Sequence, residues 1–519
     1  MANPTLLAKE GVRIAVEGCG HGTLHAIYAS IAKSCDLKGW NGVDLLIIGG
    51  DFQAVRNAHD LQAVSMPAKY YAMHDFHEYY SGARTAPYLT IFIGGNHEAS
   101  NYMWELYYGG WVAPNIYYMG AANIVRLGPL RIAGLSGIWK GHDYKKPHFE
   151  RLPYNASDVK SIYHVRELDT RKLLQVRSQV DIGLSHDWPR GVEWKGNFKQ
   201  LFRFKPYFEQ EAKDGTLGSV AATKVLQHLR PPHWFSAHMH CKYAAKWQHV
   251  HRNPDEVFLD SDSEDDTAVR SSQNGQNGQA LQPTSVGPEI ERNGGEAVDG
   301  ERHVLKAVQE KPVELLPITN EVTQFLALDK CLPNRHFLQL LEVAPQTATK
   351  LERPLSLEYD KEWLAITRVF STILYLGDPD RPVPGDRGEE VYRPLIAQEL
   401  EWVEENIVKP GKLSIPEDFQ QTAPVYDATQ GIQVDGQPQE YTNPHTQTFC
   451  DLLQIENPFH ASDEERTERM RDGPRPDTFH SDRGRGGHRG GQRGGRGRGR
   501  GSGGMRGAQG RAHGRGRGR

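Results

Sequence analysis

Short runs of apolar residues, each followed by glycine or a polar residue, recur along the chain up to about residue 250. Runs of this length without polar alternation are typical of strands buried on both faces of a sheet. They predict strands at residues 12–16, 45–48, 89–93, 130–133, 182–184 and 234–235. Helical periodicity predicts helices at residues 23–33 and 216–229. The pattern therefore indicates an α/β domain with a buried sheet.

The pattern changes after residue 253. Residues 254–302 contain the stretches DSDSEDD and SSQNGQNGQ and lack apolar periodicity, so we predict an acidic, disordered linker there. Apolar runs then resume, and a smaller C-terminal domain is expected over residues 303–456. Its predicted elements are strands at residues 325–328 and 337–343 and a helix at residues 359–370.

Residues 457–519 are expected to form a disordered tail with an Arg-Gly-rich segment at 483–519. The whole chain has a net charge of −4, but this segment holds 12 arginines and no acidic residue, which leaves −16 on the rest. Arginine offers charge, bidentate phosphate contacts and stacking, whereas glycine prevents a fixed fold. An acidic body with a cationic tail suggests a nucleic-acid partner, and we expect the tail to add an RNA contact. The alternative is a solvated tail with no specific target.

The cysteine pattern and the hydropathy of the chain indicate the compartment in which the protein resides. The five cysteines are scattered and form no Cys-x-x-Cys pair, which argues against a disulfide framework or a zinc finger and favours a reducing compartment. The N-terminus lacks a signal-peptide core, and no apolar run approaches the roughly 18 residues that span a bilayer. We therefore expect a soluble, intracellular protein with no membrane contact.

Residue types that ligate metals follow directly after the predicted strands. The motifs, in chain order, are Cys19-Gly-His21, Gly50-Asp51, Gly95-Asn96-His97-Glu98, Ser185-His186-Asp187 and His238-Met-His240. Because ligands gather beyond the carboxyl ends of strands in α/β sheets, we expect these motifs to meet in one cleft. Each histidine alone would suit a polar surface position. The ordered series instead favours a centre for divalent transition metals.

Cys19, in the stretch GCGHG, has three interpretations: a metal ligand, a nucleophile or an inert buried thiol. Metal binding itself deprotonates a thiol, so a ligand needs no neighbouring base to activate it. A thiolate is also softer than a carboxylate and shifts preference toward iron or zinc and away from magnesium. We interpret Cys19 as a ligand.

Taken in order, these motifs resemble the calcineurin-like metallophosphoesterase superfamily, whose pattern runs Asp-x-His, Gly-Asp, Gly-Asn-His-Asp/Glu, His and Gly-His-x-His. Two departures are visible, because Cys19 replaces the first aspartate and Ala237 replaces the last glycine. The cysteine narrows the resemblance to the intron lariat-debranching enzymes over about residues 11–250. That resemblance also rests on the stretches GGDFQAVRN, FIGGNHEASN, YGGWVAPNIYYMG, LSHDWPRG and WFSAHMH.

The resemblance implies a fold and a ligand set. The fold would be a two-sheet metallophosphoesterase sandwich flanked by helices over residues 11–253, followed by the C-terminal domain. Asp51 would bridge two metal positions. The first would use Cys19, His21, Asp51 and His240, and the second Asp51, Asn96, His186 and His238. Fe(II) and Zn(II) are the expected ions, with Mn(II) as the alternative.

The resemblance also implies a reaction, namely metal-dependent hydrolysis of the 2′–5′ phosphodiester at the branch point of excised intron lariat RNA. His97 is then the candidate general acid for the leaving group. Such a substrate implies a nuclear protein, with the cytoplasm as a second compartment. The alternatives are another metallophosphoesterase, such as a nuclease or a protein phosphatase, and an RNA-binding scaffold that acts through the Arg-Gly segment.

Residues 136–166 resemble the lariat-recognition loop of that family, and their aromatic and basic residues suit irregular single-stranded RNA. A mobile surface loop whose aromatic residues pack on the domain is the alternative. The predicted RNA contacts are Trp139, Lys140, Tyr144, Lys145, Lys146, Phe149, Arg151 and Tyr154, together with Arg56 and Asn57 from the second motif.

Overall fold

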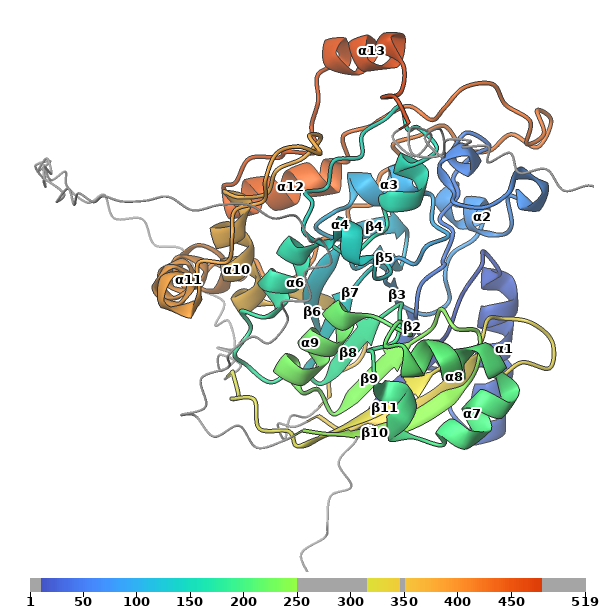
Figure 1. The fold of residues 1–519 in the computed structure, drawn as a ribbon, viewed down its shortest axis with the longest axis vertical. Helices are drawn as coiled ribbons and strands as arrows, with labels where there is room; N and C mark the ends of the chain where they lie inside the picture. Colours follow the sequence, from blue (N-terminus) through green and yellow to red (C-terminus); the bar gives the residue numbers. More distant parts are fainter. Residues whose placement is uncertain (1–10, 250–314, 346–350, 478–519) are drawn as a thin grey trace, which may run out of the picture. The chain divides into compact units, whose positions relative to one another are not determined.

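The computed structural model describes residues 11–249, 315–345 and 351–477. The predicted linker at 254–302 and the Arg-Gly segment at 483–519 lie outside the described residues. Two mixed β-sheets, with helices around them, form the described part of the chain (Figure 1). The predicted two-sheet α/β architecture is therefore confirmed.

The first sheet has six strands in the order β12-β1-β2-β3-β5-β4. The strands are β1 (Val12–Glu17), β2 (Leu45–Ile48), β3 (Thr90–Phe92), β4 (Gly110–Ala113), β5 (Ile116–Tyr118) and β12 (Leu338–Val343). Neighbours from β1 to β5 are parallel, and the two edge strands are antiparallel to them. Every residue of β2 is buried, as a parallel strand covered on both faces requires.

The second sheet has seven strands in the order β10-β11-β9-β8-β7-β6-β13. They are β6 (Ala122–Leu127), β7 (Leu130–Leu135), β8 (Ile182–Ser185), β9 (His233–Ser236), β10 (Tyr243–Gln248), β11 (Val322–Ala327) and β13 (Leu357–Tyr359). Strands β7, β8, β9 and β11 run parallel. The expected strands at residues 130–133, 182–184 and 234–235 thus lie side by side.

Two hydrophobic clusters hold these layers together. One cluster joins the facing sides of the sheets, including Ile14 and Ile47 from the first and Ile132 and Leu184 from the second. The other packs α1 (Leu24–Lys38) against the outer side of the first sheet. Helices α6 (Glu167–Leu173) and α9 (Val220–Leu229) contact β6 and β8 and lie beside the second sheet in Figure 1.

The remaining helices lie between and after these strands. They are α2 (Phe76–Tyr80), α3 (Ser100–Glu105), α4 (Gly141–Tyr144), α5 (Asp158–Ser161), α7 (Phe198–Phe204), α8 (Pro206–Lys213), α10 (Lys361–Ser371), α11 (Glu389–Val403), α12 (Pro444–Leu453) and α13 (Asp463–Asp472). Single turns of other helix types are η1 (Asp60–Ala63), η2 (Ala68–Tyr70), η3 (Val192–Lys195) and η4 (Glu404–Val408). None of the helices in the described ranges combines the length and apolar character needed to cross a membrane.

Two expected helix starts are shifted by capping. Helix α9 begins at Val220 and not at residue 216, because the Ser219 side chain accepts a hydrogen bond from the N–H of Ala222. Helix α10 begins at Lys361 and not at residue 359, because Asp360 caps it in the same way.

The C-terminal region shares its core with the N-terminal domain. Strand β12 pairs antiparallel with β1, and β11 lies between β10 and β9. Residues more than three hundred positions apart are thus neighbours, as in the pairing of Val12 with Val343. The strands expected at 325–328 and 337–343 exist, and they complete the two sheets of the N-terminal domain.

The structure corrects the prediction of disorder for the first part of the tail, residues 457–477. Helix α13 is capped by Ser462, whose side chain accepts from the N–H of Glu465. Phe459 is buried and stacks on Tyr107 with ring centroids 4.8 Å apart, and Arg469 pairs with Glu440 at 2.8 Å. One aromatic anchor and ion pairs hold this segment, which hydropathy alone does not reveal.

Candidate metal centre

Loops at the carboxyl ends of five strands bring the predicted ligands together. Cys19 and His21 follow β1, Asp51 follows β2, and Asn96 follows β3 in the first sheet. The second sheet supplies the other three from the ends of β8 and β9, namely His186, His238 and His240. This juxtaposition of both sheets' strand ends is what the ordered motifs predict.

The first predicted metal position has four ligand atoms close together. Cys19, His21, Asp51 and His240 each offer one atom, and these atoms all lie within 4.8 Å of one another. The Nε2 atoms of His21 and His240 are 3.3 Å apart. Two nitrogens bound to one tetrahedral ion at 2.0–2.1 Å are separated by about 3.4 Å. The donor set therefore fits a divalent transition metal.

The second predicted position contains two buried polar atoms without hydrogen-bond partners. The Nδ1 atom of His186 donates to the Gly49 carbonyl at 2.7 Å, which turns Nε2 toward the centre. Neither His186 Nε2 nor Asn96 Oδ1 has a hydrogen-bond partner. Leaving such groups unpaired costs about 1–3 kcal/mol each. The His238 ring lies 5.0 Å from that of His186. A cation at the predicted second position would satisfy these lone pairs.

Asp51 faces both positions. Its Oδ2 lies 3.6 Å from His21 Nε2, and its Oδ1 lies 3.4 Å from His186 Nε2. Burial raises the pKa of this carboxyl, but His186, His21 and His97 outweigh burial and the net pKa is lowered. An ionised carboxylate with one oxygen on each side is suited to bridging two cations.

Cys19 is fully buried, and its Sγ accepts a hydrogen bond from the N–H of His238 at 3.2 Å. Burial raises the pKa of this thiol well above its ordinary value, and the carboxylates of Asp51 and Glu17 raise it further. A thiol in these surroundings stays protonated without a cation, which disfavours a nucleophile. The geometry is consistent with the predicted ligand role.

We expect Cys19→Ser to weaken metal binding at the first position. An alcohol near neutral pH is a poor metal ligand. Mutating residues that only hydrogen-bond to the ligands already lowers metal affinity about 10–100-fold. Loss of a ligand itself should therefore lower the affinity by about 100-fold or more. Titration of the metal against a competing chelator measures this. Cys35→Ser, on α1, is the matched control and should bind as the parent does. Equal affinity for Cys19→Ser and the parent would contradict the ligand role.

Several residues in the ligand loops adopt left-handed backbone conformations, which are unfavourable for every residue type except glycine. The φ angles are +43° for His21, +49° for Asp51, +63° for Gln53, +58° for His238 and +48° for His240. Each such residue costs on the order of 1–3 kcal/mol. The cluster of these residues at one place marks it as a functional centre.

Glu98 holds two of these loops in place. This buried carboxyl accepts hydrogen bonds from the N–H groups of Phe52, Gln53 and Gly95 at 2.8–2.9 Å. The Gln53 amide in turn lies 3.2 Å from Nδ1 of His21. Glu98 belongs to the motif Gly95-Asn96-His97-Glu98, but the sequence alone did not predict a role for it. Its position two residues after the predicted ligand Asn96 was the available signal.

His97 lies beside the ligand clusters. Its backbone N–H donates to Asp51 Oδ1 at 2.8 Å, and its Nδ1 donates to the Ser65 carbonyl at 2.9 Å. The His97 ring is 5.8 Å from that of His21. With Nδ1 engaged, Nε2 is the nitrogen available to a substrate. Nothing in the sequence pointed to Ser65.

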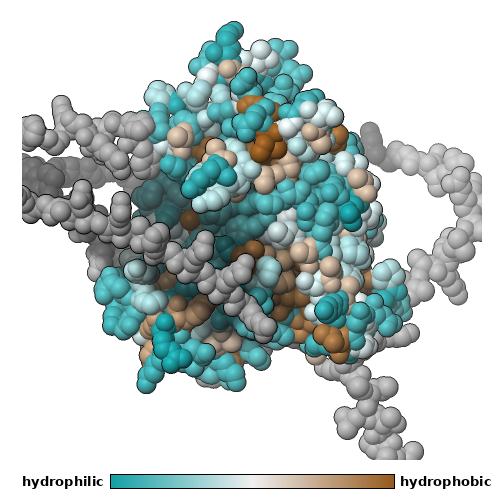
Figure 2. Space-filling model, turned by 90° about the vertical axis from the view of Figure 1, so that its right-hand side faces the viewer, coloured by the Kyte–Doolittle hydropathy of each residue, from teal (hydrophilic) through white to brown (hydrophobic). Residues whose placement is uncertain are grey.

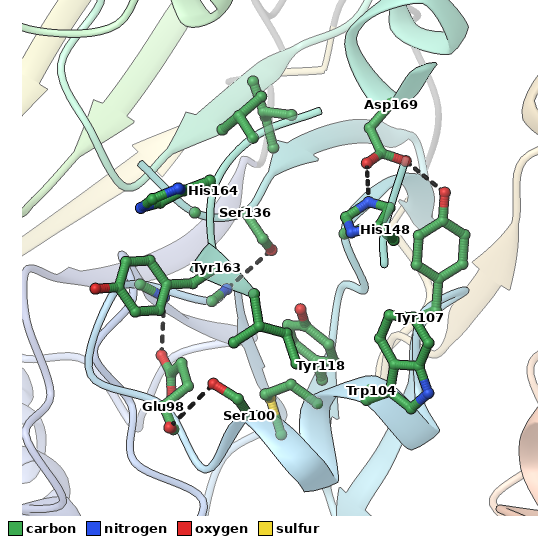
Figure 3. Close-up of a pocket in the computed structure, with 18 residues that line it drawn as sticks. Glu98, Ser100, Trp104, Tyr107, Tyr118, Ser136, His148, Tyr163, His164 and Asp169 are labelled. Carbon is green, nitrogen blue, oxygen red and sulfur yellow. Dashed lines mark hydrogen bonds and ion pairs between the residues drawn. The ribbon is translucent and has the colours of Figure 1, made fainter. Parts of the chain in front are cut away.

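A pocket of about 70 Å³ lies between the ligand loop after β3 and residues 136–166 (Figure 3). Its walls include the aromatic residues Trp104, Tyr107, Tyr118 and Tyr163. On the side opposite Glu98 in Figure 3, Asp169 accepts hydrogen bonds from His148 Nε2 at 2.7 Å and from the Tyr107 hydroxyl at 2.5 Å. This network attaches His148, within residues 136–166, to Asp169 on α6 and to Tyr107.

The predicted RNA contacts in residues 136–166 differ in accessibility. Lys140 and Lys145 are exposed and form no ion pair with any residue in the described ranges, whereas Lys146 pairs with Asp143. The aromatic residues Trp139, Tyr144 and Phe149 are half-buried. Two members are bound within the fold, since Tyr154 is buried and Arg151 pairs with Glu440 at 3.3 Å.

The prediction that Arg56 contacts RNA is wrong. Its side chain is fully buried and forms ion pairs with Asp60 at 2.9 Å and Glu105 at 2.8 Å. The adjacent Asn57 donates to the Pro424 carbonyl at 2.8 Å, so both residues bind the loop that follows α11. Sequence alone could not distinguish a buried ion pair from a phosphate contact.

We expect Arg56→Ala to lower the free energy of unfolding by about 3–5 kcal/mol, because it leaves two buried carboxylates unpaired. Chemical denaturation measures the change. Lys140→Ala, at an exposed position, should change stability by less than about 0.5 kcal/mol. Unchanged stability together with weaker RNA binding in Arg56→Ala would restore the original prediction.

Comparison with known proteins agrees with this architecture. Residues 12–242 match the model of the calcineurin-like phosphoesterases, and residues 320–458 match that of the lariat debranching enzyme C-terminal domain. The chain is 41% identical to the lariat debranching enzyme of Schizosaccharomyces pombe over 464 residues, covering 85% of this chain and 96% of the relative. It is 41% identical to the Homo sapiens enzyme over 445 residues, 86% and 69% of the two chains. Identity to the Arabidopsis thaliana enzyme is 39% over 442 residues, 85% and 86% of the two chains.

The two-sheet fold and the clustered donors at its strand ends define a metallophosphoesterase that uses divalent metal. The thiol of Cys19 and the matching C-terminal region narrow the assignment to one family of metallophosphoesterases. The chain belongs to the lariat debranching enzyme family.

Proposed function

We infer that this protein is a metal-dependent phosphodiesterase that hydrolyses the 2′–5′ phosphodiester at the branch point of excised intron lariat RNA. The observation that carries the inference is the cluster of Cys19, His21, Asp51 and His240. On the other side of Asp51 lie buried donor atoms that have no hydrogen-bond partner, His186 Nε2 and Asn96 Oδ1. They occur in a chain about 41% identical to lariat debranching enzymes over most of its length.

The ligand residues would hold two divalent cations, with Asp51 between them. Such cations supply Lewis-acid chemistry, polarising the phosphoryl group and making water a better nucleophile. The left-handed ligand loops and the Glu98 hydrogen bonds keep the donors in place before substrate arrives. A centre arranged in advance avoids reorganisation during the reaction.

His97 would act on the leaving group. Water oxygen bonds to phosphorus while the bond from phosphorus to the 2′-oxygen breaks. The attacking water loses a proton to solvent, and the departing oxygen takes up a proton. The Nδ1 hydrogen bond to the Ser65 carbonyl orients the ring, so that protonated Nε2 can donate that proton. The product would be one linear RNA with a restored 2′-hydroxyl at the former branch nucleotide and a phosphate at its 5′ end.

The donor types favour Fe(II) and Zn(II), with Mn(II) as the alternative. The first position contains a thiolate ligand and imidazoles, which suit zinc and ferrous iron. The second has oxygen and nitrogen donors only. We propose that exposed Lys140 and Lys145 contact RNA near the centre, that the Arg-Gly segment adds a further contact, and that the protein acts in the nucleus.

A synthetic 2′–5′ branched RNA and a linear RNA of the same sequence test the function. With Fe(II), Zn(II) or Mn(II) supplied anaerobically, the branched molecule should be cut at the 2′–5′ bond and the linear one left intact. Cleavage of linear RNA, or of phosphoserine peptides, with the branch preserved would assign the centre to a different phosphoesterase reaction.

We expect truncation after residue 477 to leave turnover of a short branched RNA nearly unchanged. RNA affinity should weaken, and its dependence on salt should become shallower, because each lost phosphate contact reduces the slope of log K against log salt by about 0.7 for single strands. Binding measured from low to moderate salt checks this. Loss of turnover on the short substrate would show that the tail takes part in catalysis.

A further inference from the structure

Aromatic side chains that would normally be buried are exposed around α7 and α8. The exposed fractions are 39% for Trp194, 63% for Phe204 and 84% for Tyr207. These are three of the nine large hydrophobic side chains that are exposed in the described ranges, and they fall within fourteen residues of one another. Grouped exposure of this kind marks an interaction site.

Basic side chains are interleaved with these aromatic ones. Lys199 and Arg203 on α7 are exposed, and Lys205 follows directly. None of the three forms an ion pair with a carboxylate of the described residues. Lys205 Nζ instead lies 5.6 Å from the ring centroid of Phe208. We call Trp194, Lys199, Arg203, Phe204, Lys205, Tyr207 and Lys242 the α7–α8 surface.

A groove lies beside α7, and its lining includes residues of the α7–α8 surface. It has a volume of about 440 Å³ and lies between α7 and the start of β10. Arg203 and Phe204 line one side, and Cys241 and Lys242 line the other. Cys241 directly follows the ligand His240. Figure 1 places α7 and α8 at the lower right, and Figure 2 faces that side, where hydrophobic patches lie among hydrophilic side chains beside a hollow.

The charge around the groove suits a polyanion. Lys205 directly follows the last residue of α7, and Lys242 lines the opposite side of the groove. Arg203 and Lys242, which form no ion pair with any of the described residues, thus line this groove on a body whose net charge is negative.

We propose that the α7–α8 surface binds one single-stranded arm of the branched RNA. Bases would stack on Phe204 and Tyr207, while Lys199, Arg203 and Lys242 would contact phosphates. This proposal rests on the proposed function. A branch nucleotide joins three strands, so more than one must leave the centre along the protein. Residues 136–166 flank the loop after β3, and the α7–α8 surface flanks the ligands after β9.

RNA fits this surface better than a protein partner does. Aromatic faces accept any base, and the cations lie between them at intervals of a few residues, as a stacking platform for a single strand requires. The cores of protein interfaces are instead depleted in lysine.

The test compares a branched RNA with long arms and a minimal branched RNA with arms of a few nucleotides. The aromatic variant is Phe204→Ala with Tyr207→Ala, and the charge variant is Lys199→Ala with Arg203→Ala. Leu37→Ala, an exposed position on α1, is the control. Stacking on an aromatic residue changes affinity by about 5- to 150-fold per base.

We expect the aromatic variant to raise KM for the long-armed RNA about tenfold or more, with kcat and turnover of the minimal RNA unchanged. The charge variant should also reduce the salt dependence of binding. Unchanged KM in both variants would overturn the proposal and leave the surface to a protein partner. An equal loss on both RNAs would also overturn it, by placing the effect in the centre or the fold. Failure of the parent protein to cut either RNA would instead reject the proposed function.

Discussion

Asp51→Asn is expected to lower the rate of branch hydrolysis about 10³-fold and to reduce metal content at both positions. Asparagine keeps the shape of the side chain and can still accept the hydrogen bond from the N–H of His97, so the fold should persist. The substitution removes the negative charge that would lie between the two cations. Metal ions of this kind stabilise the transition state by several kcal/mol. Each loss of about 1.36 kcal/mol slows the reaction tenfold. Single-turnover kinetics and elemental analysis of the same preparation measure both effects.

Asp36→Asn, on the outer helix α1, is the matched control and should behave as the parent does. If Asp51→Asn loses metal from one position only, the carboxylate does not bridge. Full metal content together with full activity would remove Asp51 from the centre altogether.

The second large effect is expected for His97→Ala, which should slow hydrolysis about 10²- to 10⁴-fold, the usual contribution of a general acid. Metal content should stay close to that of the parent, because the His97 side chain belongs to neither donor cluster. His186→Ala is the contrasting variant, since it removes a buried lone pair that faces the second position. It should lose both metal and activity.

The leaving group offers a sharper test of His97. A phosphodiester whose leaving group is already acidic, such as a nitrophenyl ester, needs no proton donor. The defect of His97→Ala should therefore be large on branched RNA and small on that ester. An equal defect on both substrates, or loss of metal from His97→Ala, would contradict the role as general acid.

The centre could be predicted from the sequence because its geometry follows from local rules. Each ligand lies within a few residues of the end of an apolar strand, and parallel strands place such ends along one edge of a sheet. The spacing in His238-Met-His240 and the position of Cys19 after β1 are visible without coordinates. The left-handed backbone conformations at these positions occur in the same loops, but no rule of sequence predicted them.

Long-range partners could not be predicted in the same way. Arg56 looks like a phosphate contact until Asp60 and Glu105 are seen beside it. The pairing of β12 with β1 joins segments separated by an acidic stretch without apolar periodicity, so nothing local specifies it. Helix α13 has almost no apolar face and is held by ion pairs such as that of Arg469 with Glu440.

Cobalt substitution tests the central claim most directly, because a thiolate bound to Co(II) gives a charge-transfer absorption that imidazole and carboxylate ligands do not. The Co(II)-loaded protein should show this band, and Cys19→Ala should lack it, while Cys450→Ala, a buried cysteine on α12, retains it. Persistence of the band in Cys19→Ala would show that the sulfur of Cys19 is not a donor, and the first metal position, with Cys19 among its ligands, would have to be abandoned.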